Sequence, residues 1–199
     1  MKTYIIIGVL LCISSYNSVK AQTEIDSRNR ELDFKSISET DYTSYLLKET
    51  ERLTNAKESD STFFKNRGLT LKSYCNQICE TYLTDDITGE KFWLPASFDQ
   101  GILGTAFSPN HNYFMVFGSY DGPDYNHYYD YRADVHIFKI TKNKGLNLLE
   151  FYFSFYTKEW SIEDIVWIDN ATIALKIYED GRFGNGEHLK FKYIKTSIK

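Results

Sequence analysis

The chain has 199 residues, a formal net charge of −4 and many aromatic side chains: 16 tyrosines, 14 phenylalanines and 3 tryptophans. This length suits one domain with a single core, and the acidic balance argues against a nucleic acid or an anionic membrane as partner, because few cations could neutralise phosphates. The aromatic excess favours β-sheets and large packed contacts.

The first 21 residues have the three parts of an export signal. Lys2 supplies a positive start, residues 4–13 form an apolar run of ten, and Val19-Lys20-Ala21 places small residues where a signal peptidase reads them. A run of ten is too short for a membrane-spanning helix, which needs about 20 residues. We therefore expect cleavage near Ala21 and an exported protein, periplasmic or secreted, with no stable membrane span after cleavage. The short signal is typical of a bacterium.

Two alternatives keep this segment in the membrane. A retained anchor is disfavoured because polar residues follow residue 13 at once, and lipidation at Cys12 is disfavoured because Leu11, rather than a small residue, precedes it. Cleavage would remove two lysines and no acidic residue, which leaves 21 basic against 27 acidic residues and a formal charge of −6.

The mature chain opens with a polar stretch and two predicted helices. Residues 22–38 are polar with no period and predict a linker, followed by one globular domain over residues 39–199. Asp41 suits a helix N-cap, and the spacing after it predicts a helix over residues 41–57. Apolar residues three and four apart predict a second helix over residues 69–83. Its apolar positions are Leu71, Tyr74, Cys75, Ile78, Cys79, Tyr82 and Leu83.

Cys75 and Cys79 are the only cysteines left after cleavage, and both lie on the apolar side of the second predicted helix. An oxidising compartment favours a disulfide between them. A bridge across one helical turn is geometrically awkward, so buried free thiols are the other possibility. The sequence leaves both open. Redox catalysis is disfavoured, because the spacing is not Cys-x-x-Cys and no cation is adjacent.

From residue 91 to about residue 195 the hydrophobic period changes to two. Apolar and more polar side chains alternate most plainly at residues 149–156, 173–178 and 188–193. Turn dipeptides such as Pro109-Asn110 and Asp180-Gly181 separate such stretches. The spacing predicts seven or eight antiparallel strands in a meander, as an open sheet or a sandwich. With two helices before it, the expected fold class is α+β and β-dominated.

Two segments of this predicted meander look like copies, sixty residues apart. Residues 107–116 and 167–175 each run from an aromatic residue through a turn with asparagine into a strand. The first continues through Gly118-Ser119-Tyr120-Asp121-Gly122 to a closing strand. Residues 107–140, and less closely 167–195, resemble β-propeller blades of the WD40 kind. The resemblance implies blade-like hairpins, although the region has room for only two or three blades and lacks the family's Trp-Asp pair.

The insertion at residues 120–134 is the predicted binding site. It is too polar for a core and too aromatic for a plain linker, and tyrosine offers a flat apolar face and a hydroxyl at little entropic cost. The residues expected to contact a ligand are Tyr120, Asp121, Asp124, Tyr125, His127, Tyr128, Tyr129, Tyr131 and Arg132. The alternative is a structural hairpin whose tyrosines lie flat on the sheet.

We expect a non-enzymatic exported protein that uses this insertion to contact a glycan, an envelope component or a protein. The alternative function is a hydrolase built from Asp121, Asp124 or Asp130 with His127, if two such groups converge. The sequence has no Gly-x-Ser-x-Gly or His-Glu-x-x-His motif, and its aspartates miss the EF-hand spacing, so no catalytic residue, metal or cofactor is assigned. His136 is expected on the solvent face of a strand.

Overall fold

A computed structural model describes residues 31–55, 60–120, 128–179 and 190–199 of the protein. The expected signal peptide and the start of the predicted linker lie outside these residues. The helices are α2 (Glu39–Asn55) and α3 (Asp60–Lys65), with a short 3-10 helix, η1 (Gly145–Leu148), before β8. The strands are β1 (Lys35–Ser36), β2 (Leu69–Asn76), β3 (Ile78–Asp85), β4 (Lys91–Trp93), β5 (Gly104–Phe107), β6 (Tyr113–Ser119), β7 (Ala133–Ile140), β8 (Leu149–Thr157), β9 (Ser161–Trp167), β10 (Thr172–Tyr178) and β11 (Phe191–Ser197).

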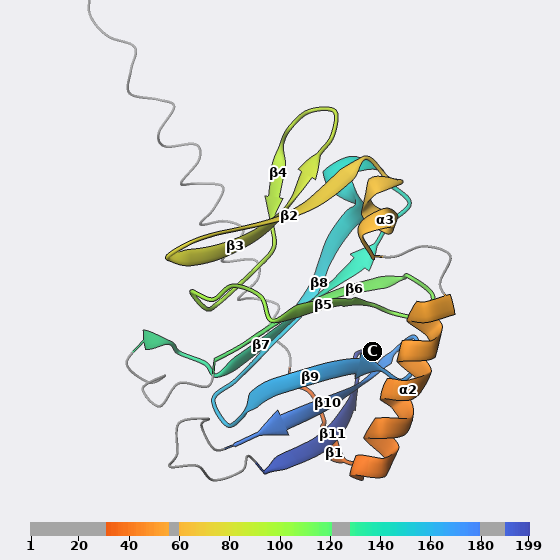
Figure 1. Ribbon diagram of the computed structural model, residues 1–199, viewed down its shortest axis with the longest axis vertical. Helices are drawn as coiled ribbons and strands as arrows, with labels where there is room; N and C mark the ends of the chain where they lie inside the picture. Colours follow the sequence, from red (N-terminus) through yellow and green to blue (C-terminus); the bar gives the residue numbers. More distant parts are fainter. Residues whose placement is uncertain (1–30, 56–59, 121–127, 180–189) are drawn as a thin grey trace, which may run out of the picture.

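In the described part of the chain, the strands form three antiparallel sheets, which lie one above another in Figure 1. The upper sheet has the order β2-β3-β4, the middle sheet β5-β6-β7-β8, and the lower sheet β9-β10-β11-β1. Eight strands of the described part begin at or after residue 91, as many as the alternating pattern predicts. The expected fold class is therefore confirmed: a β-dominated α+β fold with N-terminal helices followed by open antiparallel sheets.

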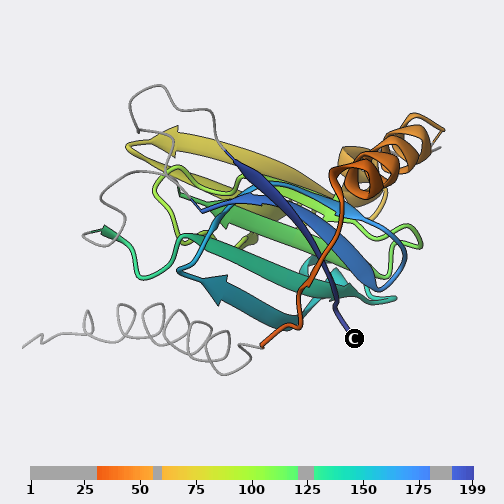
Figure 2. The same cartoon turned by 90° about the horizontal axis from the view of Figure 1, so that it is seen from below.

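The lower sheet is completed by the N-terminal arm. Lys35 and Ser36 of β1 pair with Lys195 and Ile194 of β11, and the two segments run side by side in Figure 2. The preceding Phe34 packs its ring against two aromatic rings of the core, at 5.1 Å from Phe155 and 5.5 Å from Trp160. This end of the predicted linker is thus part of the fold.

Alternation along β7 places its side chains in two different cores. Val135 and Ile137 lie in the core between the middle and lower sheets. Phe138 lies on the other side of the middle sheet, in a core that α3 covers with Phe63 and Phe64. The outer side of the lower sheet is covered by α2, whose Tyr42 packs with Val166 and Ala174. Both sides of the middle sheet are therefore buried.

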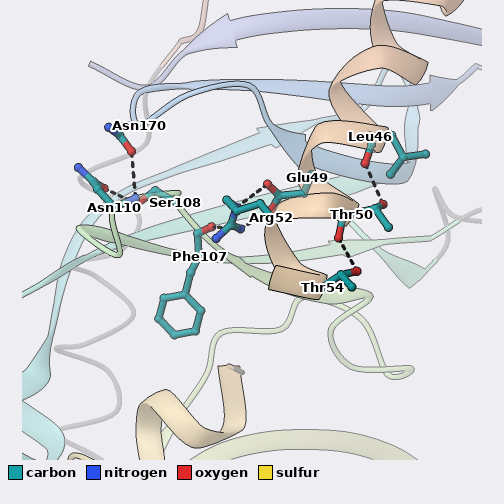
Figure 3. Close-up of polar contacts among 9 residues, drawn as sticks. All are labelled: Leu46, Glu49, Thr50, Arg52, Thr54, Phe107, Ser108, Asn110 and Asn170. Carbon is teal, nitrogen blue, oxygen red and sulfur yellow. Dashed lines mark hydrogen bonds and ion pairs between the residues drawn. The ribbon is translucent and has the colours of Figure 1, made fainter. Parts of the chain in front are cut away.

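The two similar sequence segments occupy equivalent places in the middle and lower sheets. Phe107 ends β5 and Trp167 ends β9, and each precedes a turn that leads to the second strand of its sheet. The turns touch, because the Asn110 N–H donates to Asn170 Oδ1 at 3.0 Å (Figure 3). Nearby, Arg52 of α2 forms an ion pair with the buried Glu49 and donates to the Phe107 carbonyl, which ties α2 to the first turn (Figure 3). The wider resemblance to propeller blades stays a prediction.

The helix predicted over residues 69–83 is wrong, because this segment forms the β2–β3 hairpin. Residues four apart share one side of both a helix and a strand, so that part of the apolar spacing did not distinguish the two. Residues three apart do distinguish a helix from a strand, because they share one side of a helix but lie on opposite faces of a strand. Here Leu71 faces the core, whereas Tyr74 lies on the opposite, exposed face. The strands turn at Gln77, whose φ is 68°.

The hairpin also settles the state of the cysteines. Cys75 and Cys79 are cross-strand partners with Cα atoms 4.0 Å apart, and they form a disulfide. Buried free thiols are therefore excluded. The objection to a bridge across a helical turn does not apply to opposed strand positions.

The first helix starts two residues earlier than predicted. Ser38 precedes it, and Ser38 Oγ accepts a hydrogen bond from the Asp41 N–H at 3.0 Å while the Ser38 N–H donates to Asp41 Oδ2 at 3.3 Å. This is the reciprocal arrangement of a capping box. Hydrogen bonds from the Ser38 side chain and backbone lower the pKa of Asp41. The residue predicted as N-cap is therefore the third residue of the helix.

Candidate functional site

Two of the predicted tyrosines belong to an aromatic cluster at one end of the middle sheet. Tyr120 follows β6, Tyr129 lies in the insertion, and their ring centroids are 4.7 Å apart. Phe98 completes the cluster, with its centroid 5.2 Å from that of Tyr129 and 6.3 Å from that of Tyr120. We call these three side chains the aromatic cluster. It joins the insertion to residues 94–101, a segment that the sequence analysis did not single out.

Hydrogen bonds position this cluster. The Tyr120 N–H donates to the Arg132 carbonyl at 2.9 Å, which brings the two ends of the insertion together. The Asp99 N–H donates to the Tyr129 hydroxyl oxygen at 3.3 Å. Burial, together with the nearby negative charge of Asp99, raises the pKa of Tyr129. The hydroxyl therefore stays protonated at neutral pH, with the Asp99 side chain as a hydrogen-bond partner.

The remaining described residues of the predicted site divide into exposed and structural ones. Tyr128 is 73% exposed. Tyr131 packs on Tyr156 of β8, with ring centroids 4.7 Å apart. Arg132 is buried, and its guanidinium donates to the backbone carbonyls of Glu159 and Glu179, so it holds strand ends together. The other four predicted residues, Asp121, Asp124, Tyr125 and His127, lie outside the described residues.

A pocket of about 250 Å³ lies beside the aromatic cluster, between β3 and residues 94–99. It is lined by Ile78, Cys79, Glu80, Thr81, Trp93, Leu94, Ala96, Ser97, Phe98 and Asp99. Trp93 is 48% exposed, and the exposed Glu80 and Asp99 add carboxylates to the lining. The pocket therefore combines an accessible indole with hydrogen-bond acceptors.

Backbone contacts with the disulfide hairpin shape one wall of this pocket. The Cys79 N–H donates to the Asp99 carbonyl at 2.7 Å, and the Leu94 N–H donates to the Thr81 carbonyl at 2.8 Å. Gly101 permits the close approach, since its φ is +79° and a Cβ there would lie 2.9 Å from Cys79 Cβ. Sequence reasoning missed this wall, because the hairpin was predicted as a helix and residues 94–101 were not assigned to any element.

A buried carboxylate and imidazole lie beneath the same segment. His136, expected on a solvent face, is 2% exposed, and its Nε2 lies 3.1 Å from Asp134 Oδ2. The same oxygen accepts a hydrogen bond from the Ser97 N–H at 3.2 Å. The side of β7 that seemed free for solvent is covered by residues 94–101, which were not assigned to any element. The pair thus anchors the segment that lines the pocket.

Burial acts against the charge of Asp134, but its partners outweigh this effect. Desolvation alone would raise the pKa of Asp134, whereas the hydrogen bond and charge of His136 and the hydrogen bond from Ser97 lower it, and the net direction is downward. Asp134 is therefore an ionised, internally bonded group. We assign it a structural role in holding the pocket segment.

Comparison with protein-family models found no match for this chain, and comparison with curated proteins found none either. Within the described ranges, no group of three or more histidine, cysteine, aspartate or glutamate side chains could hold a metal ion. None of the described helices is long and apolar enough to cross a membrane.

Proposed function

We propose that the protein is an exported, non-enzymatic binding protein, and that the aromatic cluster and the adjoining pocket contact a glycan. The observation that carries this proposal is the convergence of sequence-distant groups: Trp93 from β4, Asp99 from the following segment and Tyr129 from the insertion, with the buried Phe98 packed against Tyr129. Exposed Tyr128 belongs to the same insertion.

The chemistry of these groups supports a sugar as the ligand. An indole or phenol face packs on the C–H face of a sugar ring, while carboxylates and hydroxyls exchange hydrogen bonds with its hydroxyl groups. A pocket of about 250 Å³ is smaller than the roughly 300–1,000 Å³ of typical small-molecule sites, so it suits one ring of a longer chain. An envelope component or a protein surface is the other class of partner that tyrosine-rich loops suit.

The test is a binding measurement with defined glycans and matched variants. The mature chain is titrated with soluble peptidoglycan fragments and with oligosaccharides of glucose and of N-acetylglucosamine, followed by calorimetry. Trp93→Ala and Tyr129→Phe should each weaken binding about tenfold or more, the loss expected for about 1.4 kcal/mol of contact energy. Ile87→Ala is the control, because Ile87 is 93% exposed in the turn between β3 and β4. Binding that Ile87→Ala weakens as much as Trp93→Ala, or no binding to any glycan, would contradict the proposal.

A further inference from the structure

One side of α2 carries only leucine and threonine over about three turns. Successive residues of an α-helix are rotated by about 100°, which places the six side chains within a sector of about 120°. They are Thr43, Leu46, Leu47, Thr50, Leu53 and Thr54. All six are exposed, and Leu47 is 59% exposed. We call this surface the Leu/Thr stripe.

The stripe is less polar than its threonines suggest. Thr50 Oγ1 donates to the Leu46 carbonyl at 2.8 Å, and Thr54 Oγ1 donates to the Thr50 carbonyl at 2.8 Å (Figure 3). These hydroxyl protons are already used inside the helix, so no partner has to supply an acceptor for them. The stripe is therefore suited to apolar packing.

The stripe leads into a pocket of about 390 Å³ between the N-terminal half of α2 and the lower sheet. Thr43 and Leu46 belong both to the stripe and to the lining of this pocket. The pocket is lined by Glu39, Tyr42, Thr43, Leu46, Glu163, Asp164, Lys176 and Tyr193. The two tyrosine rings have centroids 5.2 Å apart, and they form an aromatic wall.

The tyrosine hydroxyls orient carboxylates around this pocket. The Tyr42 hydroxyl donates to Asp164 Oδ2 at 2.8 Å, and the Tyr193 hydroxyl donates to Glu39 Oε1 at 2.9 Å. Burial first, and the charge of Asp164 second, raise the pKa of Tyr42, so its hydroxyl remains a donor.

The lining carries an excess of negative charge. Glu39, Glu163 and Asp164 supply three carboxylates, and Lys176 supplies one ammonium group, which lies 3.9 Å from the centroid of the Phe191 ring. Carboxylates beside aromatic rings attract a cation by both charge and ring electrostatics.

We propose that the Leu/Thr stripe and this acidic pocket dock an amphipathic helix of a partner protein, whose apolar side packs on the leucines and whose lysine or arginine enters the pocket. Charge complementarity selects this partner, because the carboxylates repel acidic segments and phosphates. The mode is the packing of an amphipathic helix along an apolar surface, with a basic side chain fixing its register.

The test uses three synthetic amphipathic peptides that differ at one end position, which is lysine, norleucine or glutamate. Their dissociation constants for the mature chain are measured by fluorescence anisotropy. We expect the lysine peptide to bind about tenfold more tightly than the norleucine peptide, a difference that Glu163→Gln and Asp164→Asn each reduce. Leu47→Asp should weaken all three, and Ile87→Asp should weaken none.

Three results would overturn the proposal. The first is no binding of the lysine peptide at about 1 mM, a concentration that detects even weak complexes. The second is a lysine preference that survives both pocket variants. The third is a dimer in sedimentation experiments that Leu47→Asp dissociates, which would assign the stripe to a second copy of this chain. Thermal melting of each variant shows whether it is folded.

Discussion

Replacing Asp134 tests whether the buried pair beneath residues 94–101 stabilises the fold. Asp134→Ala removes the acceptor for two donors, His136 Nε2 at 3.1 Å and the Ser97 N–H at 3.2 Å. Hydrogen bonds to a charged group contribute about 1.5–3 kcal/mol each. We therefore expect the free energy of unfolding to fall by about 3–6 kcal/mol, the loss of two such bonds. Urea unfolding at neutral pH measures it.

The stability contributed by Asp134 should also depend on pH in a defined direction. The pKa of Asp134 is lowered in the folded protein, so the folded state holds the charged form more strongly than the unfolded state, where the pKa is about 3.9. Its contribution is then fully present above about pH 5 and is lost as the pH falls through the folded pKa. Asp134→Asn should flatten the loss of stability below about pH 4 compared with the unchanged protein. Equal acid profiles, or a cost below about 1 kcal/mol for Asp134→Ala, would refute the reasoning.

Three other changes have calculable effects. Reducing the Cys75–Cys79 disulfide, or replacing both cysteines by serine, should lower the free energy of unfolding by about 2 kcal/mol, because the bridge closes a loop of only five residues. Urea unfolding with and without reductant measures this loss. A cost above about 4 kcal/mol would contradict a loop-entropy origin. Gly118→Ala should lower the free energy of unfolding by about 1–3 kcal/mol, because its Cβ would lie 2.5 Å from Asp134 Oδ1 and 3.0 Å from Phe98 Cδ2. An unchanged melting temperature would show that the neighbouring side chains can move to accommodate the methyl group. Ser38→Ala should lower the free energy of unfolding by about 1 kcal/mol through loss of the helix cap, and Ser38→Asp should restore most of this loss. Thermal melting measures both variants. Equal melting temperatures for Ser38→Ala and the unchanged protein would show that the cap does not stabilise the helix.

The alternating segments were the predictable part of the fold. Around Phe153 and Leu175, apolar and more polar side chains alternate because one face of each strand packs in a core. This alternation can be read from the sequence without knowing which strands pair with each other. The helix over residues 41–57 was also predictable, within two residues at each end, because α2 buries one side only.

Long-range pairing was the part that the sequence did not reveal. The β2–β3 segment has apolar residues four apart, which suit both a helix and a strand, and only the cross-strand partner decides between them. His136 seemed exposed because β7 alternates, yet residues 94–101 cover that face. Similarly, the two pockets depend on segments such as 94–99 and 163–164 that meet residues distant in sequence.

The pairing of β1 with β11 has a consequence for how the chain folds. Lys35 and its partner Lys195 are about 160 residues apart, so this edge closes only after nearly the whole domain has been made and collapsed. Until then, the last strand offers an unprotected row of backbone groups to neighbouring molecules. Refolding yield should therefore depend on protein concentration, and the short N-terminal arm acts as an intramolecular guard against aggregation.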